Sequence, residues 1–486
     1  MWPMHRLLVL AALLSLACST PPEAPEPAKR PNFVVFLVDD LGWSDGGVFG
    51  SDLYETPNID RLAADGMRFS TSYAACTVCS PTRAAMMTGK YPGRTHVTDW
   101  IRGHQRPFAK LRVPDWTMKI EARQTTIAEA LRADGYRTAM VGKWHLMPNG
   151  DPDMGDYVPE KHGFEFNVGG NEWGAPGSYF HPYEHPKQTT RGIGPLPPGG
   201  KDGDYLTDRL SAEAASLIEK FGDEPFLLYF PFYSVHTPIQ AKEEDIAHYE
   251  PLVKEGMLHT DPVYASMTTS VDRGVGLVRA KLEEMGIADN TVILFTGDNG
   301  GLDRDGTGRP TENRPLREGK GSSYEGGVRT PGLAYWPGVT GAGAVSEEPI
   351  ITVDFYPTIL EIAGVEGDPA HNAKVDGKSL VPLLRDAEAA FDREALYWHY
   401  PHYHSQGATP HSAIRAGDWR LVEFFEDDRV ELYNLAEDIG EKKDLAAEKP
   451  DKVTELRAML TAWRADVGAQ MPTENPDYDP AKDAQR

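Results

Sequence analysis

The chain has 486 residues, of which 40% are hydrophobic and 10% aromatic, so it is long enough to bury a large core. Its 73 acidic residues outnumber its 49 basic ones, and the formal net charge of −24 argues against nucleic acid or an anionic membrane as a partner. An anionic substrate would therefore have to be held by a local basic pocket.

The first residues have the pattern of an export signal. An apolar run from Leu7 to Leu14 is too short to span a bilayer, and Ala17-Cys18 resembles a bacterial lipoprotein cleavage site with Cys18 as the lipidated residue. We therefore predict a signal peptide over residues 1–18 and a Pro-rich tether over residues 19–31. This predicts an exported protein, periplasmic or anchored in the outer membrane of a Gram-negative bacterium.

The run from Asn32 to Val38 is continuously apolar and β-branched, which predicts a strand covered on both faces. Asp39 and Asp40 follow it directly. Two carboxylates beside so apolar a strand are costly unless a cation neutralises them, and open parallel sheets bind ligands at the carboxyl ends of their strands. The alternative is a solvated Asp-Asp turn.

The stretch from Cys79 to Gly89 has the sequence of a turn that leads into a helix. Ser80 suits an N-cap, and Pro81 suits the first helical position. Cys79 would then lie beside a helix N-terminus, where the dipole favours negative charge on its side chain, and Arg83 could fold back towards the same spot. Cys79 is therefore a candidate nucleophile.

Two other interpretations of this cysteine stand beside the first. Cys76 and Cys79 form a Cys-x-x-Cys pair, but a zinc site would need a second pair, and a thioredoxin-like module would open a short βαβ unit with this motif. A buried structural cysteine under a helix start is the other alternative.

Three further segments are predicted to be core strands, at residues 136–141, 225–230 and 291–296. Polar side chains follow them in turn: Lys143 and His145, then His236, then Asp298 and Asn299. Each could be an ordinary surface or structural residue, but carboxyl ends of parallel strands meet at one edge. We therefore expect these side chains to converge with the two aspartates on one rim.

Two irregular segments are predicted to complete the site. Residues 149–204 are rich in Gly, Pro, Tyr and His, which is typical of a wall or lid. The glycine-spaced loop Pro315–Pro331 presents Lys320, and its glycines allow the backbone to approach a small anion.

Near residue 391 the pattern changes to short strands separated by turns, followed by an amphipathic helix. We predict an α/β catalytic domain over residues 32–390, with a large, mostly parallel sheet flanked by helices. A smaller α+β domain with an antiparallel sheet would cover residues 391–486. Its loop Trp398–His404 could line the substrate mouth; a metal cluster or plain surface is the alternative for these histidines, although no acid partners them.

The candidate residues also predict a metal. Hard oxygen donors suit Ca²⁺ or Mg²⁺ better than zinc, and the chain offers four of them: Asp39, Asp40, Asp298 and Asn299.

The motif Cys79-x-Pro81-x-Arg83, followed by Thr88-Gly89, resembles the signature of the type I, formylglycine-dependent sulfatase family of the alkaline phosphatase-like superfamily. The resemblance spans Asn32 to about Pro331. It implies an alkaline phosphatase-like core. The run His411–Arg420 also looks like bacterial polysaccharide sulfatases and arylsulfatases. One departure is Met147, where glycine is frequent in the family.

The resemblance implies hydrolysis of sulfate esters, most of all on a sulfated carbohydrate, with release of inorganic sulfate. Cys79 would be oxidised to formylglycine (3-oxoalanine) by a formylglycine-generating or anaerobic sulfatase-maturating enzyme, and the hydrated aldehyde would be the nucleophile. If Cys18 carries lipid, only Cys76 remains, and no intrachain disulfide is expected. One Ca²⁺ would be held by the four oxygen donors together with residue 79.

The resemblance also implies catalytic roles. Arg83 and His145 would hold and deprotonate the gem-diol. Lys143 and Lys320 would bind the sulfate, and His236, with Lys320, would protonate the leaving alcohol. The alternatives are a phosphonate monoester or phosphodiester hydrolase of the same superfamily, and a non-catalytic glycan-binding protein, which would have lost ligands that this chain keeps.

Overall fold

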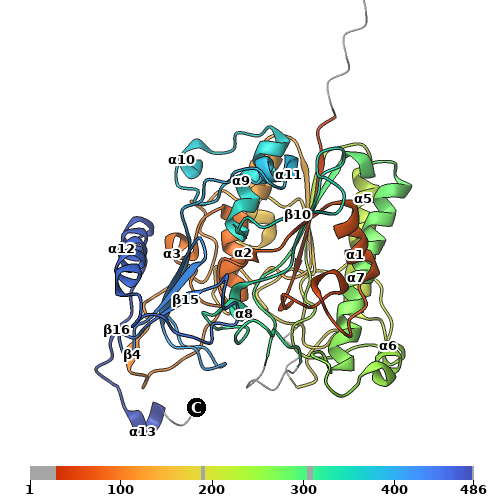
Figure 1. Cartoon of the computed structure of the whole chain (residues 1–486). Helices are drawn as coiled ribbons and strands as arrows, with labels where there is room; N and C mark the ends of the chain where they lie inside the picture. Colours follow the sequence, from red (N-terminus) through yellow and green to blue (C-terminus); the bar gives the residue numbers. More distant parts are fainter. Residues whose placement is uncertain (1–28, 188–191, 304–309, 484–486) are drawn as a thin grey trace, which may run out of the picture.

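An eight-stranded sheet forms the core of the computed structural model, which describes residues 29–187, 192–303 and 310–483 (Figure 1). Its order is β10 (Ala344–Ser346), β2 (Met67–Phe69), β9 (Gly332–Tyr335), β8 (Thr291–Gly297), β1 (Asn32–Val38), β7 (Phe226–Pro231), β5 (Arg137–Val141) and β6 (Phe166–Val168). The four pairings from β8 to β6 are all parallel, and so is the β10–β2 pairing, whereas β9 runs antiparallel to both β2 and β8. The predicted mostly parallel α/β sheet is confirmed.

Strand β1 shows why the sheet is covered on both faces. Val34, Phe36 and Val38 pack in one hydrophobic cluster, and Phe33, Val35 and Leu37 pack in another. Successive side chains of a strand point to opposite faces, so an apolar strand without alternation needs a layer on each side. Figure 1 shows the two helical layers that provide them.

The first cluster includes side chains of α1 (Pro57–Asp65), α5 (Leu206–Phe221), α6 (Glu243–Tyr249) and α7 (Pro262–Glu284). The second includes side chains of α2 (Cys79–Thr88), α4 (Ile127–Ala133), α9 (Phe355–Ala363) and α11 (Val381–Arg385). Helix α4 begins with a complete capping box between Thr126 and Glu129.

The C-terminal part forms a separate antiparallel sheet in the order β12 (Leu396–Tyr400), β13 (His411–Ala416), β14 (Trp419–Phe424) and β15 (Val430–Asn434). Helix α12 (Pro450–Val467) packs on it, and residues of α2 and of the loop after β8 share the same hydrophobic cluster. The predicted α+β unit is confirmed, while its boundary at residue 391 stays a prediction.

Short elements connect these layers. They are β3 (Ser72–Tyr73) paired with β11 (Ile350–Ile351), β4 (Leu111–Arg112) paired with β16 (Thr473–Glu474), and the helices α3 (Pro92–Thr95), α8 (Glu325–Val328), α10 (Pro369–Asn372) and α13 (Pro480–Asp483).

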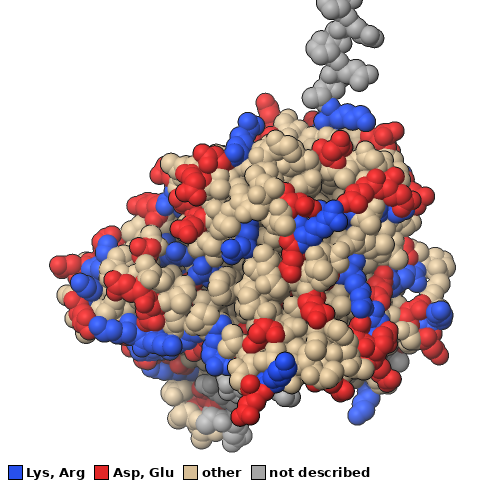
Figure 2. All heavy atoms as spheres, turned by 45° about the vertical axis from the view of Figure 1, so that its right-hand side comes forward, with Lys and Arg blue, Asp and Glu red and all other residues tan. Residues whose placement is uncertain are grey.

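The predicted signal peptide, with Cys18, lies outside the described residues, as does most of the predicted tether. Within the described part of the chain, none of the helices combines the length and apolarity that crossing a membrane requires. On the face drawn in Figure 2, basic side chains lie among acidic ones and do not gather in one field. An anionic substrate approaching this face would therefore depend on local cations in its binding pocket.

Candidate active site

The carboxyl ends of the central strands bring the predicted residues together. Asp39 follows β1, Lys143 follows β5 by two residues, and Asp298 follows β8. Lys143 Nζ lies 2.6 Å from Asp39 Oδ2, and Lys320 Nζ lies 2.7 Å from Asp40 Oδ1. The predicted convergence on one rim is confirmed.

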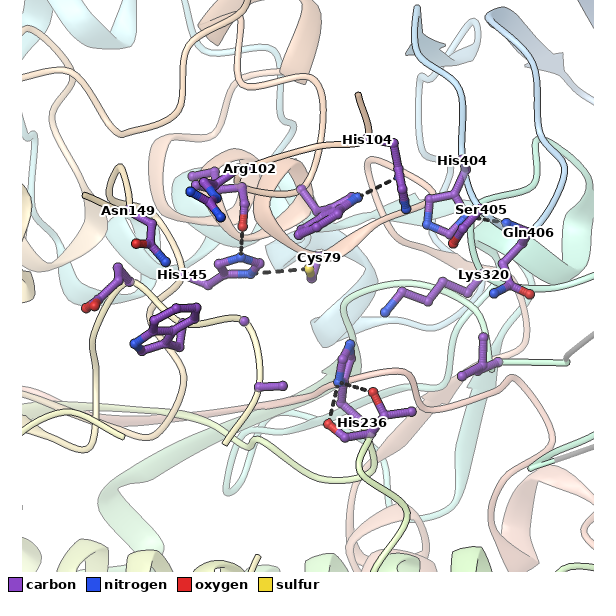
Figure 3. A pocket seen from close by; sticks show the side chains of 18 residues that line it. Cys79, Arg102, His104, His145, Asn149, His236, Lys320, His404, Ser405 and Gln406 are labelled. Atoms are coloured by element: carbon purple, nitrogen blue, oxygen red, sulfur yellow. Dashed lines mark hydrogen bonds between the residues drawn. The ribbon is translucent and has the colours of Figure 1, made fainter. Parts of the chain in front are cut away.

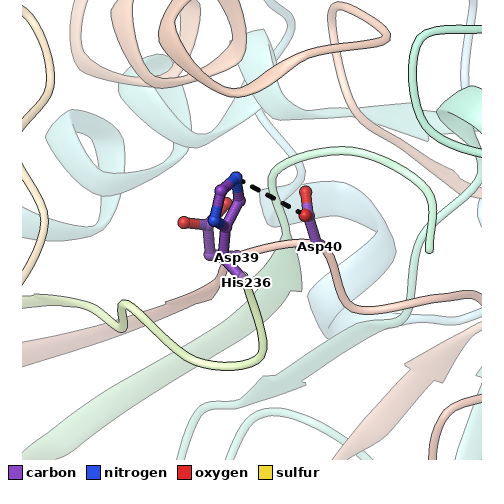
Figure 4. A group of neighbouring side chains, drawn as sticks. All are labelled: Asp39, Asp40 and His236. Carbon is purple, nitrogen blue, oxygen red and sulfur yellow. Dashed lines mark ion pairs between the residues drawn. The ribbon is translucent and has the colours of Figure 1, made fainter. Parts of the chain in front are cut away.

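Four oxygen-bearing side chains form a buried acid cluster at this rim: Asp39, Asp40, Asp298 and Asn299. The Asp40 backbone N–H donates to Asp298 Oδ1 at 3.2 Å, and Asn299 Nδ2 donates to Asp40 Oδ1 at 2.7 Å. Candidate ligand atoms of Asp39, Asp40 and His236 all lie within 4.8 Å of one another (Figure 4).

Two oxygens of the acid cluster indicate what it could bind. Asp39 Oδ1 and Asn299 Oδ1 are buried and have no hydrogen-bond partner among the described residues. Buried polar atoms are normally satisfied, so two orphan acceptors beside clustered carboxylates fit a cation with oxygen ligands. The donor set therefore suits Ca²⁺ or Mg²⁺.

The two aspartates after β1 differ in their electrostatics. Burial, together with the nearby Asp298 carboxylate, raises the pKa of Asp39 to about 8. Burial also acts to raise the pKa of Asp40, but Lys320 and His236 outweigh it, and the pKa lies below its usual range. Burial and the neighbouring carboxylate thus disfavour the charged form of Asp39, and a divalent cation bound in the cluster would favour it.

Arg83 does not fold back to Cys79. Its guanidinium is fully buried and donates to Asp298 Oδ2 from Nε at 2.9 Å and from Nη2 at 2.7 Å. Its Nη1 donates to the Lys143 backbone carbonyl at 2.9 Å. Arg83 therefore fixes a predicted metal ligand and the backbone of a predicted sulfate-binding lysine.

Helix α2 begins at Cys79, with Val78 as its N-cap, so the predicted Ser80 N-cap is wrong. Ser80 Oγ instead donates to the His145 carbonyl oxygen at 2.9 Å, and it accepts the Ile101 backbone N–H at 3.2 Å. These contacts tie the start of α2 to two neighbouring loops, which compete successfully for the hydroxyl that would have capped the helix.

The unmodified Cys79 side chain is held as a thiol. Burial raises the pKa of the Cys79 thiol, and the opposing influence of Lys143 and Lys320 does not overcome it. Burial therefore outweighs any favourable effect of the helix dipole on a Cys79 thiolate. Cys76 is also a free, buried thiol, and burial raises its pKa to about 12, which makes a reactive dithiol pair a poor interpretation.

His145 is oriented as a base towards Cys79. Its Nε2 lies 2.5 Å from the Ile101 carbonyl oxygen, which can only accept, so Nε2 carries the proton. Its Nδ1 lies 3.4 Å from Cys79 Sγ and 3.2 Å from Ser80 Oγ. Burial, with Lys143 nearby, lowers the pKa of His145 well below its usual value, so the ring is neutral and Nδ1 is free to accept.

Close contact with a glycine helps to hold this ring. A Cβ at Gly174 would lie 2.4 Å from His145 Cε1, so only glycine leaves room for the imidazole. Gly174 lies within the segment 149–204, and several residues of that segment line the cavity described below. The predicted role of the segment as a wall of the site is confirmed.

His236 and Lys320 face the acid cluster from the other side. His236 Nδ1 donates to the Thr237 carbonyl at 2.9 Å, and Nε2 lies 3.7 Å from Asp40 Oδ2. Burial and the charge of Lys320 lower the pKa of His236 well below its usual value. Burial acts to lower the pKa of Lys320, but Asp40 outweighs it and the pKa is raised, so the ammonium stays charged.

A cavity of about 430 Å³ opens above these groups (Figure 3). Cys79, His145, His236 and Lys320 line it, while the acid cluster, Arg83 and Lys143 do not. The sequence interpretation missed one wall, the loop from Trp100 to His104, which has neither periodicity nor a motif to mark it. From the C-terminal part, the predicted loop contributes His404.

Comparisons with known proteins agree with this geometry. A family model described as Sulfatase matches residues 31–365, and one described as N-sulphoglucosamine sulphohydrolase, C-terminal, matches residues 319–466.

Similar curated proteins include a "Sulfatase" of Formosa agariphila, 31% identical over 94% of this chain and 93% of the relative. The N-acetylgalactosamine-6-sulfatase of Mus musculus is 33% identical over 81% of this chain and 72% of the relative. Among solved structures, Ps i-CgsB in complex with k-i-k-neocarrahexaose has a TM-score of 0.73 at 30% identity, covering 94% of this chain and 96% of that one.

Proposed function

The chain belongs to the sulfatase family and is a sulfuric ester hydrolase, and from this premise we propose that it removes sulfate from a sulfated carbohydrate with a formylglycine nucleophile made from Cys79. The observation that carries the proposal is the cavity in which Cys79, His145, His236 and Lys320 meet above a buried acid cluster. A maturation enzyme that oxidises Cys79 would be a required partner.

The carbohydrate assignment has two sources of support. The similar solved structure holds an oligosaccharide, k-i-k-neocarrahexaose, and a similar curated protein is named for N-acetylgalactosamine 6-sulfate ester hydrolysis. The cavity also has aromatic and polar lining residues, including Trp100, Trp173 and Asn149, which suit a sugar ring with hydroxyl groups.

We assign the acid cluster as a Ca²⁺ site, with the oxygens of Asp39, Asp40, Asp298 and Asn299 as its protein ligands and residue 79 facing it. The two orphan acceptors support this assignment. A divalent cation bound there would supply positive charge for the sulfate oxygens and lower the pKa of the nucleophilic hydroxyl.

The remaining steps, proton transfer and binding of the sulfate group, are assigned to protein side chains. His145 accepts the proton of the nucleophile at Nδ1, because its Nε2–H is committed to the Ile101 carbonyl. Lys320 lines the cavity, and Lys143 lies beneath it against Asp39; we propose that both offer ammonium groups to the equatorial sulfate oxygens, on which charge develops as the ester bond breaks.

His236 is proposed to donate a proton to the leaving alcohol from Nε2, with Lys320 assisting. The neutral ring has its proton on Nδ1, so the role requires that the negative charge of a bound sulfate ester raise the pKa of His236. Arg83 acts indirectly in this scheme by holding Asp298.

The activity is tested with sulfate, phosphate and phosphonate esters of 4-nitrophenol, each measured on protein co-produced with a maturation enzyme. The proposal predicts the highest kcat/KM for the sulfate ester, and added Ca²⁺ should support it. A higher kcat/KM for the phosphonate ester would make the chain a phosphonate monoester hydrolase of the same superfamily instead.

We also propose that the protein is exported and anchored by lipid on Cys18, on the basis of the apolar run Leu7–Leu14 and the following Ala17-Cys18. The wild-type protein should partition with membranes and acquire radiolabelled palmitate, whereas Cys18→Ala should do neither. A mature protein without lipid in the native host would contradict this assignment.

A further inference from the structure

One wall of the cavity contains two histidines that the catalytic scheme does not use. His104 comes from the loop before β4, and His404 comes from the loop after β12, far away in sequence. Their rings meet edge to face with centroids 5.0 Å apart, and Trp100 meets His104 in the same manner at 5.0 Å. Figure 3 shows both histidines on the Lys320 side of Cys79, opposite His145 and Arg102.

The hydrogen bonds of these rings fix their tautomers. Trp100 Nε1–H donates to His104 Nδ1 at 3.0 Å, and the Gln406 backbone N–H donates to His404 Nδ1 at 3.2 Å. A neutral imidazole that accepts at Nδ1 carries its proton at Nε2. Neither Nε2 has a hydrogen-bond partner in the described parts of the chain, and neither is among the buried unsatisfied atoms. Two N–H donors are therefore available to a molecule in the cavity.

Both rings are held neutral. Burial lowers the pKa of His104, with Arg106 and Lys320 adding to the effect. Burial, reinforced by His104 and Lys320, lowers the pKa of His404 to about 3. The pair thus offers dipolar donors without adding positive charge. Such donors suit the oxygen of a hydroxyl group better than a second anionic substituent, which would favour a cation.

The position of His404 depends on a neighbouring glycine. A Cβ at Gly321 would lie 2.1 Å from His404 Nδ1, and Gly321 has a φ of +84°, a conformation that favours glycine. Gly321 follows Lys320, so the loop that presents the catalytic ammonium also makes room for the ring. This arrangement places the histidine pair beside the group that is proposed to assist the leaving alcohol.

We propose that His104 and His404 form a hydroxyl-binding subsite for the sugar that carries the scissile sulfate. The inference rests on the proposed function, because it takes the alcohol on the Lys320 side to be that sugar. Trp100 holds His104 in place through its indole N–H. The two Nε2–H groups donate to sugar hydroxyl or ring oxygens, so the subsite selects carbohydrate over other sulfate esters.

The competing explanation is that the two rings only pack against the Lys320 loop. The two explanations differ in which substrates respond to substitution. If the rings only pack, substitution of either ring should lower kcat/KM by the same factor for every sulfate ester. A hydroxyl-binding role affects a sugar ester and spares an aryl ester, because an aryl leaving group has no hydroxyl to accept the bond.

The test compares wild type with His104→Phe and His404→Phe, which keep a ring but remove the donor. The substrates are 4-nitrophenyl sulfate and one sugar ester. The sugar ester is the one with the highest kcat/KM for wild type among galactose 6-sulfate, N-acetylgalactosamine 6-sulfate and k-i-k-neocarrahexaose. Each variant should lose about tenfold in kcat/KM on the sugar ester, the effect of one hydrogen bond to an uncharged group. Turnover of 4-nitrophenyl sulfate should stay within about twofold, as expected for loss of a contact that the aryl ester does not make.

Two further variants control for folding and shape. His248→Phe changes a histidine on α6 that lies outside the cavity, and it should leave both substrates unaffected. His404→Gln keeps an N–H donor on the side chain and should recover part of the loss on the sugar ester. Thermal midpoints of all variants are compared with that of wild type.

The outcomes separate the subsite from the proposed function. Equal losses on both substrates, or no loss on the sugar ester, would overturn the subsite and leave the sulfatase assignment standing. Turnover of 4-nitrophenyl sulfate without turnover of any sugar ester in the panel would also overturn it. If the wild type releases sulfate from none of the esters, the result contradicts both the proposed function and the subsite.

Discussion

Replacement of Arg83 by methionine tests how the acid cluster is held together. Arg83, Asp39 and Asp298 are all fully buried, and the guanidinium is the partner of the Asp298 carboxylate at 2.7 Å and lies 3.8 Å from Asp39. Methionine has a similar length but no charge. The variant would leave Asp298 and the Lys143 carbonyl without the three hydrogen bonds that Arg83 donates.

The size of the effect follows from these contacts. Removing one partner of a buried ion pair costs about 3–5 kcal/mol, because the remaining charge stays desolvated and unpaired. Arg83→Lys keeps a positive charge but loses the planar fork that binds Asp298 through two nitrogens, and we expect a smaller loss of about 2 kcal/mol. The double variant Arg83→Met/Asp298→Asn removes the stranded carboxylate and should recover about 1–3 kcal/mol relative to Arg83→Met.

The assay is urea unfolding in EGTA, so that a bound cation does not mask the lost charge. Tryptophan fluorescence and far-ultraviolet circular dichroism are followed together, because coincident transitions support two-state analysis of a chain this long. A loss below about 1 kcal/mol for Arg83→Met would refute the reasoning. A double variant that is less stable than Arg83→Met would refute it as well.

Four further predictions address the chemistry. Cys79→Ala should abolish turnover of 4-nitrophenyl sulfate while moving the thermal midpoint by less than about 2 °C, and residual wild-type turnover would contradict the assigned nucleophile. EGTA should lower activity and the thermal midpoint together, because a cation present at 1,000 times its Kd stabilises the folded state by about 4 kcal/mol; an indifferent melting curve would argue against the metal site. Gly174→Ala should reduce kcat by at least about tenfold, since its Cβ would displace His145, and an unchanged kcat would remove His145 from the mechanism. Because the pKa of His145 is lowered by burial and by Lys143, the base stays neutral as pH falls through 6.5, so kcat/KM should decline only at lower pH; a decline centred at 6.5 in wild type would contradict a neutral buried base.

Much of the fold could be predicted from the sequence because the central strands are buried on both faces. Apolar runs marked β1, β7 and β8, the apolar residues Ala139–Val141 marked β5, and the ends of β1 and β8 placed Asp39 and Asp298 on one rim. The strands β2, β6 and β10 were not predicted, because three residues are too few to show the alternation of apolar and polar residues that indicates a strand.

The details of the site depended on contacts between segments distant in sequence, which local patterns do not encode. Ser80 has the chemistry of an N-cap, but the His145 and Ile101 backbones engage its hydroxyl. Arg83 is one turn from Cys79, yet the stronger attraction of a buried carboxylate turns it towards Asp298. His104 lies in a loop without any marking motif, and only its packing on His404 reveals it.

The central claim is that a formylglycine at position 79 performs the reaction. The most direct measurement is mass spectrometry of the peptide that contains residue 79, with an aminooxy reagent to trap the aldehyde, on preparations made with graded amounts of a maturation enzyme. The account predicts that kcat for 4-nitrophenyl sulfate rises in proportion to the converted fraction and vanishes where Cys79 is intact. Full activity in a preparation whose Cys79 is entirely unmodified would contradict it.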